Sequence, residues 1–245
     1  QNVEWIAITL PIFTDSLADP TVRLKYRPAG DPSGEPFSFD DSDLEDFIVT
    51  AKRAGFKVTI AFEFYPVILP VSPSSPGCGT PNYKPNRWLL GQPVVNPNIP
   101  VESCINPADW WWAPSHPLHA KNVALFWNSF TQIAVKYAKM AQRTGVDIFL
   151  LSTEQDNLFR TRSAQAPYTN HFRNELTAMV NSVRAVYSGV VTYEQLWTAI
   201  AHPEYFAGGM GTAAAFDGVF EDLNFNVVGL SAYFNLTNSA PISVL

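Results

Sequence analysis

The chain has 245 residues, a net charge of −6 and a hydrophobic fraction of 47%. Its length predicts one large domain or two small ones, and its negative charge argues against nucleic acid or an anionic membrane surface as a partner. No apolar run reaches the roughly 18 residues of a membrane span. With 13% aromatic residues, 20 prolines and only 16% charged residues, the composition is typical of an exported polysaccharide-handling protein. We therefore expect a secreted or periplasmic protein. The sequence starts without an initiating Met or signal peptide, which indicates a processed or shortened N-terminus.

The first half of the chain predicts a strand, a helix and a second strand. The apolar run over 3–13 predicts the first strand. A helix follows in "DDSDLEDFIVTAKRAGF", where Ser42 and Glu45 have the spacing of a capping box and Gly55 is the expected stop. The run "KVTIAFEFYP" then predicts a strand.

A long irregular segment, 67–117, separates these elements from the second half. Loops of this length inside a compact domain are usually functional. The helical pattern resumes over Leu118–Thr144 and is stopped by Gly145, and "VDIFLLSTEQD" predicts the next strand. A further helix in "YTNHFRNELTAMVNSVRAVYSG" has Gly189 as its expected stop, and "VVTYEQLW" and "FNVVGLSAYFNL" predict two more strands.

Strands that alternate with helices predict an α/β fold with a parallel sheet. Two architectures fit this pattern, the doubly wound sheet and the eight-stranded (β/α)8 TIM barrel. No strand is followed by the Gly-rich turn of a doubly wound nucleotide-binding protein. Polar and aromatic residues instead follow the strands, where barrel enzymes hold their catalytic groups; they are Glu63, Tyr65, Glu154, Asp156, Glu194, Trp197, Tyr233 and Asn235. We expect a single barrel-like domain over residues 1–245.

Four segments, taken in order, carry a family resemblance. They are "LEDFIVTAKRAGFKVTIAFEF", "FWNSFTQIAVKYAKMAQRTGVDIFLLSTEQD", "VNSVRAVYSGVVTYEQLW" and "FNVVGLSAYFNL". Together they resemble the clan A glycoside hydrolases, and within them the endo-β-mannanase-like barrels. The resemblance implies a glycosidase of β-linked saccharides (mannosidic, glucosidic or galactosidic), with Glu154 as the general acid/base.

The same resemblance implies an incomplete barrel. Its strands match the second to sixth of the family, so the first, seventh and eighth strands have no counterpart. The family's nucleophile lies at the end of the seventh strand, which puts ordinary retaining activity in doubt. Open barrel edges recruit partners, and we expect a homo-oligomer in which subunits cover each other's open sides.

Glycoside hydrolysis normally needs a second carboxylate. Glu194 ends the strand next to that of Glu154 and is our choice, although it could equally be a polar residue leaving the sheet. Glu63 could instead be a structural carboxylate paired with an Arg, and Asp156 a loop or helix cap. Despite these alternatives we expect Glu63 and Asp156 to contact the substrate. The other expected sugar contacts are Tyr65, Trp197, Tyr233 and one residue of the loop run Trp110–Trp112, with Trp112 chosen.

Two cysteines, Cys78 and Cys104, lie in the long segment, and we expect a disulfide between them. His116 and His119 have a spacing that could ligate a metal, but a role at the start of the helix is the better interpretation. The acidic run 40–43 lacks the later residues of a calcium loop, and we treat the Asn235 sequon as chance. We therefore expect no metal site and no cofactor.

The leading hypothesis is thus a glycoside hydrolase whose partner is an oligo- or polysaccharide. The alternative is a non-catalytic carbohydrate-binding barrel fragment that lacks the nucleophile.

Overall fold

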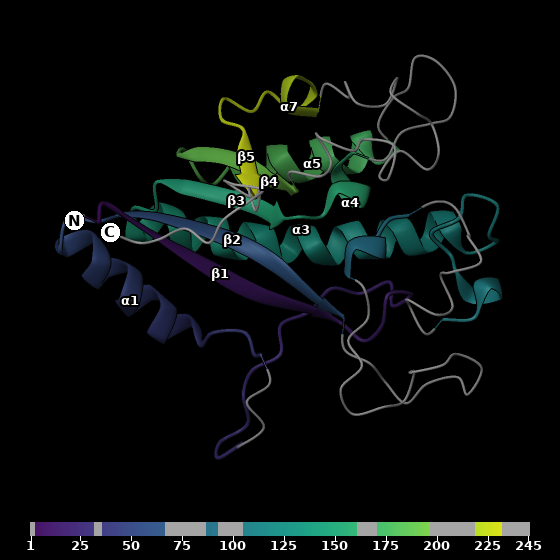
Figure 1. Ribbon diagram of the computed structural model, residues 1–245, viewed down its shortest axis with the longest axis horizontal. Helices are drawn as coiled ribbons and strands as arrows, with labels where there is room; N and C mark the ends of the chain where they lie inside the picture. Colours follow the sequence, from purple (N-terminus) through teal and green to yellow (C-terminus); the bar gives the residue numbers. More distant parts are fainter. Residues whose placement is uncertain are drawn as a thin grey trace, which may run out of the picture.

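Figure 1 shows a computed structural model of the chain, which describes residues 3–31, 36–66, 87–92, 105–160, 171–196 and 219–231. Five parallel strands form one sheet in the order of the chain. They are β1 (Trp5–Thr14), β2 (Lys57–Pro66), β3 (Ile148–Thr153), β4 (Val190–Leu196) and β5 (Gly229–Ser231). Because each strand pairs with the one before it, the sheet has the order of a barrel wall and not the reversed order of a doubly wound sheet. The predicted α/β, barrel-like class is confirmed.

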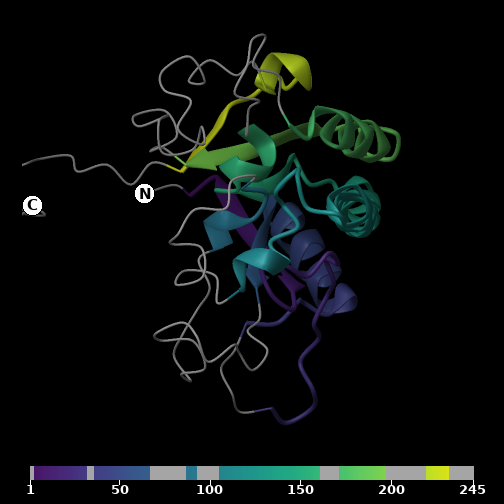
Figure 2. The same ribbon diagram turned by 90° about the vertical axis from the view of Figure 1, so that its right-hand side faces the viewer.

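Three long helices lie on the same side of this sheet (Figure 2). They are α1 (Asp41–Arg53), α3 (His119–Thr144) and α5 (Arg173–Arg184). The shorter elements are η1 (Arg87–Leu89), η2 (Pro107–Asp109), α4 (Asp156–Arg160) and α7 (Val219–Asp222). Within the described ranges, none of the helices has the length and hydropathy needed to cross a lipid bilayer.

The core fills the layer between sheet and helices, and strand alternation decides which side chains reach it. On β2, Phe62 and Phe64 are fully buried and pack edge-on against Phe130 of α3. Phe62 also makes edge-to-face contacts with Phe149 of β3 and Tyr137 of α3. Since alternate residues point to opposite faces, Glu63, which lies between these phenylalanines, faces away from the helices. Its carboxylate therefore lies on the helix-free face.

The start of α1 differs from the expected capping box. Asp40 is the N-cap, and its carboxylate accepts hydrogen bonds from the backbone N–H and the hydroxyl of Ser42, at 3.0 and 2.6 Å. Glu45 is not part of the cap, because both its oxygens accept hydrogen bonds from Arg143 of α3. The prediction of a Ser42–Glu45 capping box is therefore wrong. It placed the N-cap two residues too late, because Asp40 and Ser42 are equally good N-cap residues.

The other helix boundaries follow the sequence more closely. Gly145 ends α3 in the left-handed conformation, with φ 75°, which glycine adopts without steric cost. The helix α5 ends earlier than expected, at Arg184 with Ala185 as its C-cap, so Gly189 is not its stop. The strand predicted over 3–13 is β1, which is shifted to Trp5–Thr14.

Asp147 ties three elements together at the start of β3. One of its carboxylate oxygens accepts hydrogen bonds from Lys52 of α1 at 2.6 Å and from the Val58 backbone N–H of β2 at 2.7 Å. Burial acts to raise the pKa of Asp147, but these two hydrogen bonds and the Lys52 charge outweigh it, and the net pKa is lowered from 3.8. The charged form of Asp147 therefore stabilises the folded chain.

Candidate active site

Three carboxylates lie at the C-terminal ends of three adjacent strands, Glu63 on β2, Glu154 just after β3 and Glu194 on β4. An irregularity between Leu150 and Thr153 shifts the register, so that Thr153 is the partner of Glu194. The backbone N–H of Glu154 donates to the Glu194 carbonyl at 2.7 Å. The sheet thus places the backbones of Glu154 and Glu194 side by side.

Glu154 has an unusual backbone conformation. Its φ is 56°, in the left-handed region that residues other than glycine seldom occupy, at a cost of roughly 1–3 kcal/mol. Glu154 is only 6% exposed, so its surroundings hold it in this conformation. Residues with such strain concentrate at functional sites. This is a reason, independent of the sequence pattern, to regard Glu154 as a functional residue.

Arg87 joins Glu63 to Glu154 across the rim of the sheet. Its Nη1 forms an ion pair with Glu63 Oε1, and its Nη2 donates to Glu154 Oε2 at 3.3 Å. The Tyr65 hydroxyl donates to the other Glu63 oxygen at 2.8 Å, and burial raises the pKa of Tyr65. Glu63 therefore has the Arg partner that one interpretation of the sequence allowed. Arg87 itself was missed, because it lies in an irregular segment with no motif.

The segment that carries Arg87 is docked onto α4. Asn157 Nδ2 donates to the Trp88 carbonyl at 2.5 Å. Gly91 has φ 83°, and a Cβ there would lie 2.7 Å from Leu158 Cδ2, so only glycine fits so close to α4. The Trp88 ring lies 5.8 Å from the Arg87 guanidinium and is 41% exposed. Trp88 is a second missed candidate, an accessible aromatic face beside the carboxylates.

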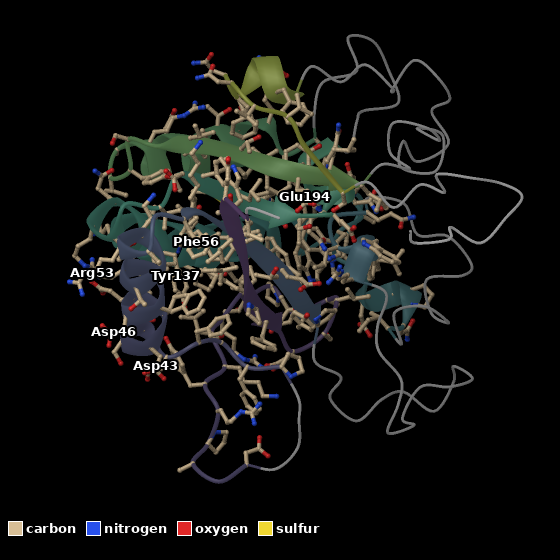
Figure 3. The ribbon with its side chains drawn as sticks, turned by 60° about the vertical axis from the view of Figure 1, so that its left-hand side comes forward. Asp43, Asp46, Arg53, Phe56, Tyr137 and Glu194 are labelled. Carbon is tan, nitrogen blue, oxygen red and sulfur yellow. The ribbon has the colours of Figure 1, made fainter. Side chains whose placement is uncertain are left out.

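Glu194 accepts a hydroxyl hydrogen bond on each carboxylate oxygen. Thr153 of β3 donates to Oε2 at 3.0 Å, and Ser231 of β5 donates to Oε1 at 2.5 Å. Figure 3 shows Glu194 at the end of β4, well away from the exposed face of α1 that carries Asp43, Asp46 and Arg53. The two hydroxyls fix the orientation of the Glu194 carboxylate from both neighbouring strands.

Asp156 begins α4, and its Oδ2 accepts the backbone N–H of Leu196 at 2.9 Å. This contact joins the start of α4 to the end of β4. The hydrogen bond agrees with the structural alternative for Asp156 and places its side chain beside the rim.

The expectation that Trp112 faces a substrate is not met. Trp110, Trp111 and Trp112 are at most 2% exposed. Each indole N–H donates to a backbone carbonyl, of Gln92, Ala18 and Leu17 respectively. The three rings belong to the main core, where Trp112 packs edge-on against Phe126 of α3 and against Phe172. Trp112 therefore has no free face for a sugar. The other predicted site residues, Trp197, Tyr233, Asn235, Cys78 and Cys104, lie outside the described residues.

A cavity of about 620 Å³ lies at the opposite end of the sheet. It is lined by the starts of the strands, among them Trp5, Lys57, Ile148 and Val190. Asp147 is the one carboxylate among its lining residues, and it is already bound to Lys52. This cavity therefore does not offer a pair of carboxylates, whereas the rim around Glu154 does.

No protein-family model and no curated protein matches the chain. Two structures of a GH113 β-1,4-mannanase, one of them a complex, match it with TM-scores of 0.56 and 0.55, each at 16% identity over 94% of this chain and 52% of theirs. The GH113 β-mannanase AaManA from Alicyclobacillus acidocaldarius, in complex with ManMIm, matches with a TM-score of 0.50 at 16% identity, over 83% of this chain and 47% of its own.

The fold is that of part of a TIM barrel and is similar to about half of the barrel of these β-mannanases. The chain spans about half the length of the mannanases that it matches. Five parallel strands in chain order agree with such a partial barrel, as the resemblance of the sequence implied. At 16% identity the similarity is one of fold.

Proposed function

We propose that the chain is a glycoside hydrolase domain that acts on β-linked saccharides with Glu154 as its general acid/base. The observation that carries the proposal is the position of Glu154, a nearly buried carboxylate in a strained conformation at the C-terminal end of β3. Barrel enzymes hold their catalytic groups at this end of the sheet. Glu194 on the neighbouring strand is the proposed second carboxylate.

The contacts suggest a different catalytic role for each of the two carboxylates. Glu194 is an acceptor for two hydroxyls, which suits a carboxylate that stays charged, as a nucleophile or a base must. Glu154 would deliver the proton to the glycosidic oxygen, so it must be protonated when the substrate is bound. Because the Arg87 cation contacts Glu154, substrate binding would have to weaken that contact, while Glu63 keeps Arg87 in place.

The proposed substrate lies across the rim. Trp88 offers an exposed aromatic face next to Arg87, and aromatic rings stack on the apolar faces of sugars. Tyr65, which is half-buried beside Glu63, would supply a polar contact. Because the structures of similar fold are β-mannanases, β-1,4-linked mannan is the first substrate to test.

The test is hydrolysis of β-mannan and of aryl β-glycosides by the chain and by three variants. Glu154→Gln and Glu194→Gln should each lower turnover by about 10²–10⁴-fold, the usual loss when a general acid or base is removed. Glu4→Gln is the matched control, the same chemical change at an exposed position near the other end of the sheet. Full activity in Glu154→Gln would refute the proposal. Full activity in Glu194→Gln alone would show that the second carboxylate is a residue other than Glu194.

The alternative function is carbohydrate binding without turnover. It is favoured by the internal contacts of the carboxylates, since Arg87 holds Glu154 and two hydroxyls hold Glu194. Binding of mannan oligosaccharides that depends on Trp88, with no hydrolysis by the unmodified chain, would support this second candidate.

A further inference from the structure

Two histidines meet where two neighbouring helices begin. His119 is the first residue of α3, and His171 precedes α5 by two residues. The helices α3 and α5 pack side by side (Figure 2). The two imidazole ring centres are 5.5 Å apart with an interplanar angle of 48°, and both residues are partly exposed.

The hydrogen bonds of His119 decide which of its nitrogens has a lone pair available. Its Nδ1 lies 2.9 Å from the Trp111 carbonyl, which can only accept, so Nδ1 carries the proton. The Nε2 atom then has the free lone pair. This is the arrangement of metal-binding histidines, in which the other ring nitrogen donates to a carbonyl or carboxylate and fixes the ring.

His171 is also suited to bind as a neutral imidazole. Among the described residues, no hydrogen bond involves its ring nitrogens, which leaves them available to a ligand.

We propose that His119 and His171 together bind a divalent transition-metal ion of the copper, nickel or zinc class. With metal–nitrogen bonds of about 2.0–2.1 Å, two imidazoles on one tetrahedral ion have ring centres about 5 Å apart, close to the spacing observed. Imidazole suits these ions, whereas magnesium and calcium prefer oxygen. Within the described ranges, no group of three or more His, Cys, Asp or Glu residues gathers. The two histidines are thus the protein ligands that the described residues offer, and an ion held by both would join the start of α3 to the start of α5.

His116 provides a matched control in the same turn of the chain. Its Nε2 lies 3.1 Å from the Ala108 carbonyl, and its Nδ1 accepts from the Leu118 backbone N–H at 3.1 Å. Both nitrogens are therefore already engaged, and His116 has no lone pair to offer. A variant at this position removes an imidazole without removing a ligand.

The experiment titrates tag-free protein with Cu²⁺, Ni²⁺ and Zn²⁺ by calorimetry, with Mg²⁺ as a negative control. The unmodified chain should bind one Cu²⁺ most tightly, in keeping with the general order of affinities, and its electron paramagnetic resonance spectrum should show nitrogen ligands. His119→Asn and His171→Asn should each weaken binding at least as much as the roughly 10–100-fold loss caused by removing an outer-shell partner. An Asn at 119 can still donate to the Trp111 carbonyl, which preserves the local fold.

Three outcomes would overturn the proposal. The first is that the chain shows no saturable binding of Cu²⁺, Ni²⁺ or Zn²⁺. The second is that binding is unchanged in either His119→Asn or His171→Asn. The third is that His116→Asn weakens metal binding as much as those two variants do. Circular dichroism of each variant shows that it is folded before its binding is compared. None of these readouts depends on glycosidase activity, so the metal site and the proposed function can fail separately.

Discussion

Replacing Arg87 by Met tests the network that holds Glu154. The variant keeps a long side chain but leaves two carboxylates without their shared cation. Exposed ion pairs contribute about 0–1 kcal/mol, whereas removing one partner of a buried pair costs about 3–5 kcal/mol. The side chains of Arg87, Glu63 and Glu154 are 23%, 18% and 7% exposed, which places the network between these limits. We expect Arg87→Met to lower the free energy of unfolding by about 2–3 kcal/mol at pH 7.

The assay is urea and thermal unfolding followed by circular dichroism. For a chain of this size each kcal/mol shifts the Tm by about 2–4 °C, so Arg87→Met should lower it by about 4–12 °C. Double-mutant cycles with Glu63→Gln and with Glu154→Gln separate the two contacts. Each cycle should show a coupling, because Arg87 contacts both carboxylates.

Arg53→Met is the control, because Arg53 is exposed on α1 (Figure 3). Surface changes of this kind usually alter stability by no more than about 0.5 kcal/mol. If Arg87→Met is as stable as Arg53→Met, or if neither cycle shows coupling, the network does not stabilise the site and the reasoning is refuted.

Four other predictions cover acid stability, packing, the disulfide and assembly. The lowered pKa of Asp147 means that its stabilising effect is present above about pH 3.9, the unfolded value, and is lost as pH falls through the lower folded value. Asp147→Asn should therefore reduce stability at pH 7 and flatten the acid side of a urea-unfolding series, and an unchanged series would contradict this. Trp112→Ala should cost about 3–5 kcal/mol and Trp88→Ala less than about 0.5 kcal/mol, because Trp112 is fully buried and Trp88 is 41% exposed; equal effects in unfolding assays would be inconsistent with their burial. A Cys78–Cys104 disulfide should lower the mass under non-reducing conditions by about 2 Da, since one bridge loses two hydrogens, and two alkylatable thiols would rule it out. We also propose that the chain forms a homo-oligomer, and light scattering that finds a monomer at all concentrations would exclude it.

Strand positions could be predicted because they depend on a local pattern. The apolar run before Ser152 marks β3, and the polar residues after it mark the C-terminal rim of the sheet. Parallel strands bring their C-terminal ends to one edge, so the proximity of Glu154 to Glu194 followed from fold class alone. The long amphipathic pattern of α3 fixed its limits to within one residue.

Contacts made by the irregular segments could not be predicted in this way. Arg87 contacts Glu154 from 67 positions away in the chain, and no periodic pattern of apolar residues predicts such a contact. Trp112 was expected to face a sugar substrate, but its indole N–H donates to the Leu17 carbonyl in a loop distant in the sequence. The N-cap of α1 was predicted at the wrong residue because Asp40 and Ser42 are both good N-cap residues. Only the hydrogen bonds in the structure show that Asp40 is the cap.

The chain-order arrangement of the sheet has a consequence for synthesis on the ribosome. The β1–β2 ladder runs from Trp5–Lys57 to Thr14–Pro66 and is complete before β3 is made. Each later strand of the described sheet pairs with the strand made just before it, so its partner has already been synthesised when it emerges. Chains emerge N-terminus first, and this sheet can therefore be extended one strand at a time, always at the edge formed by the strand made last.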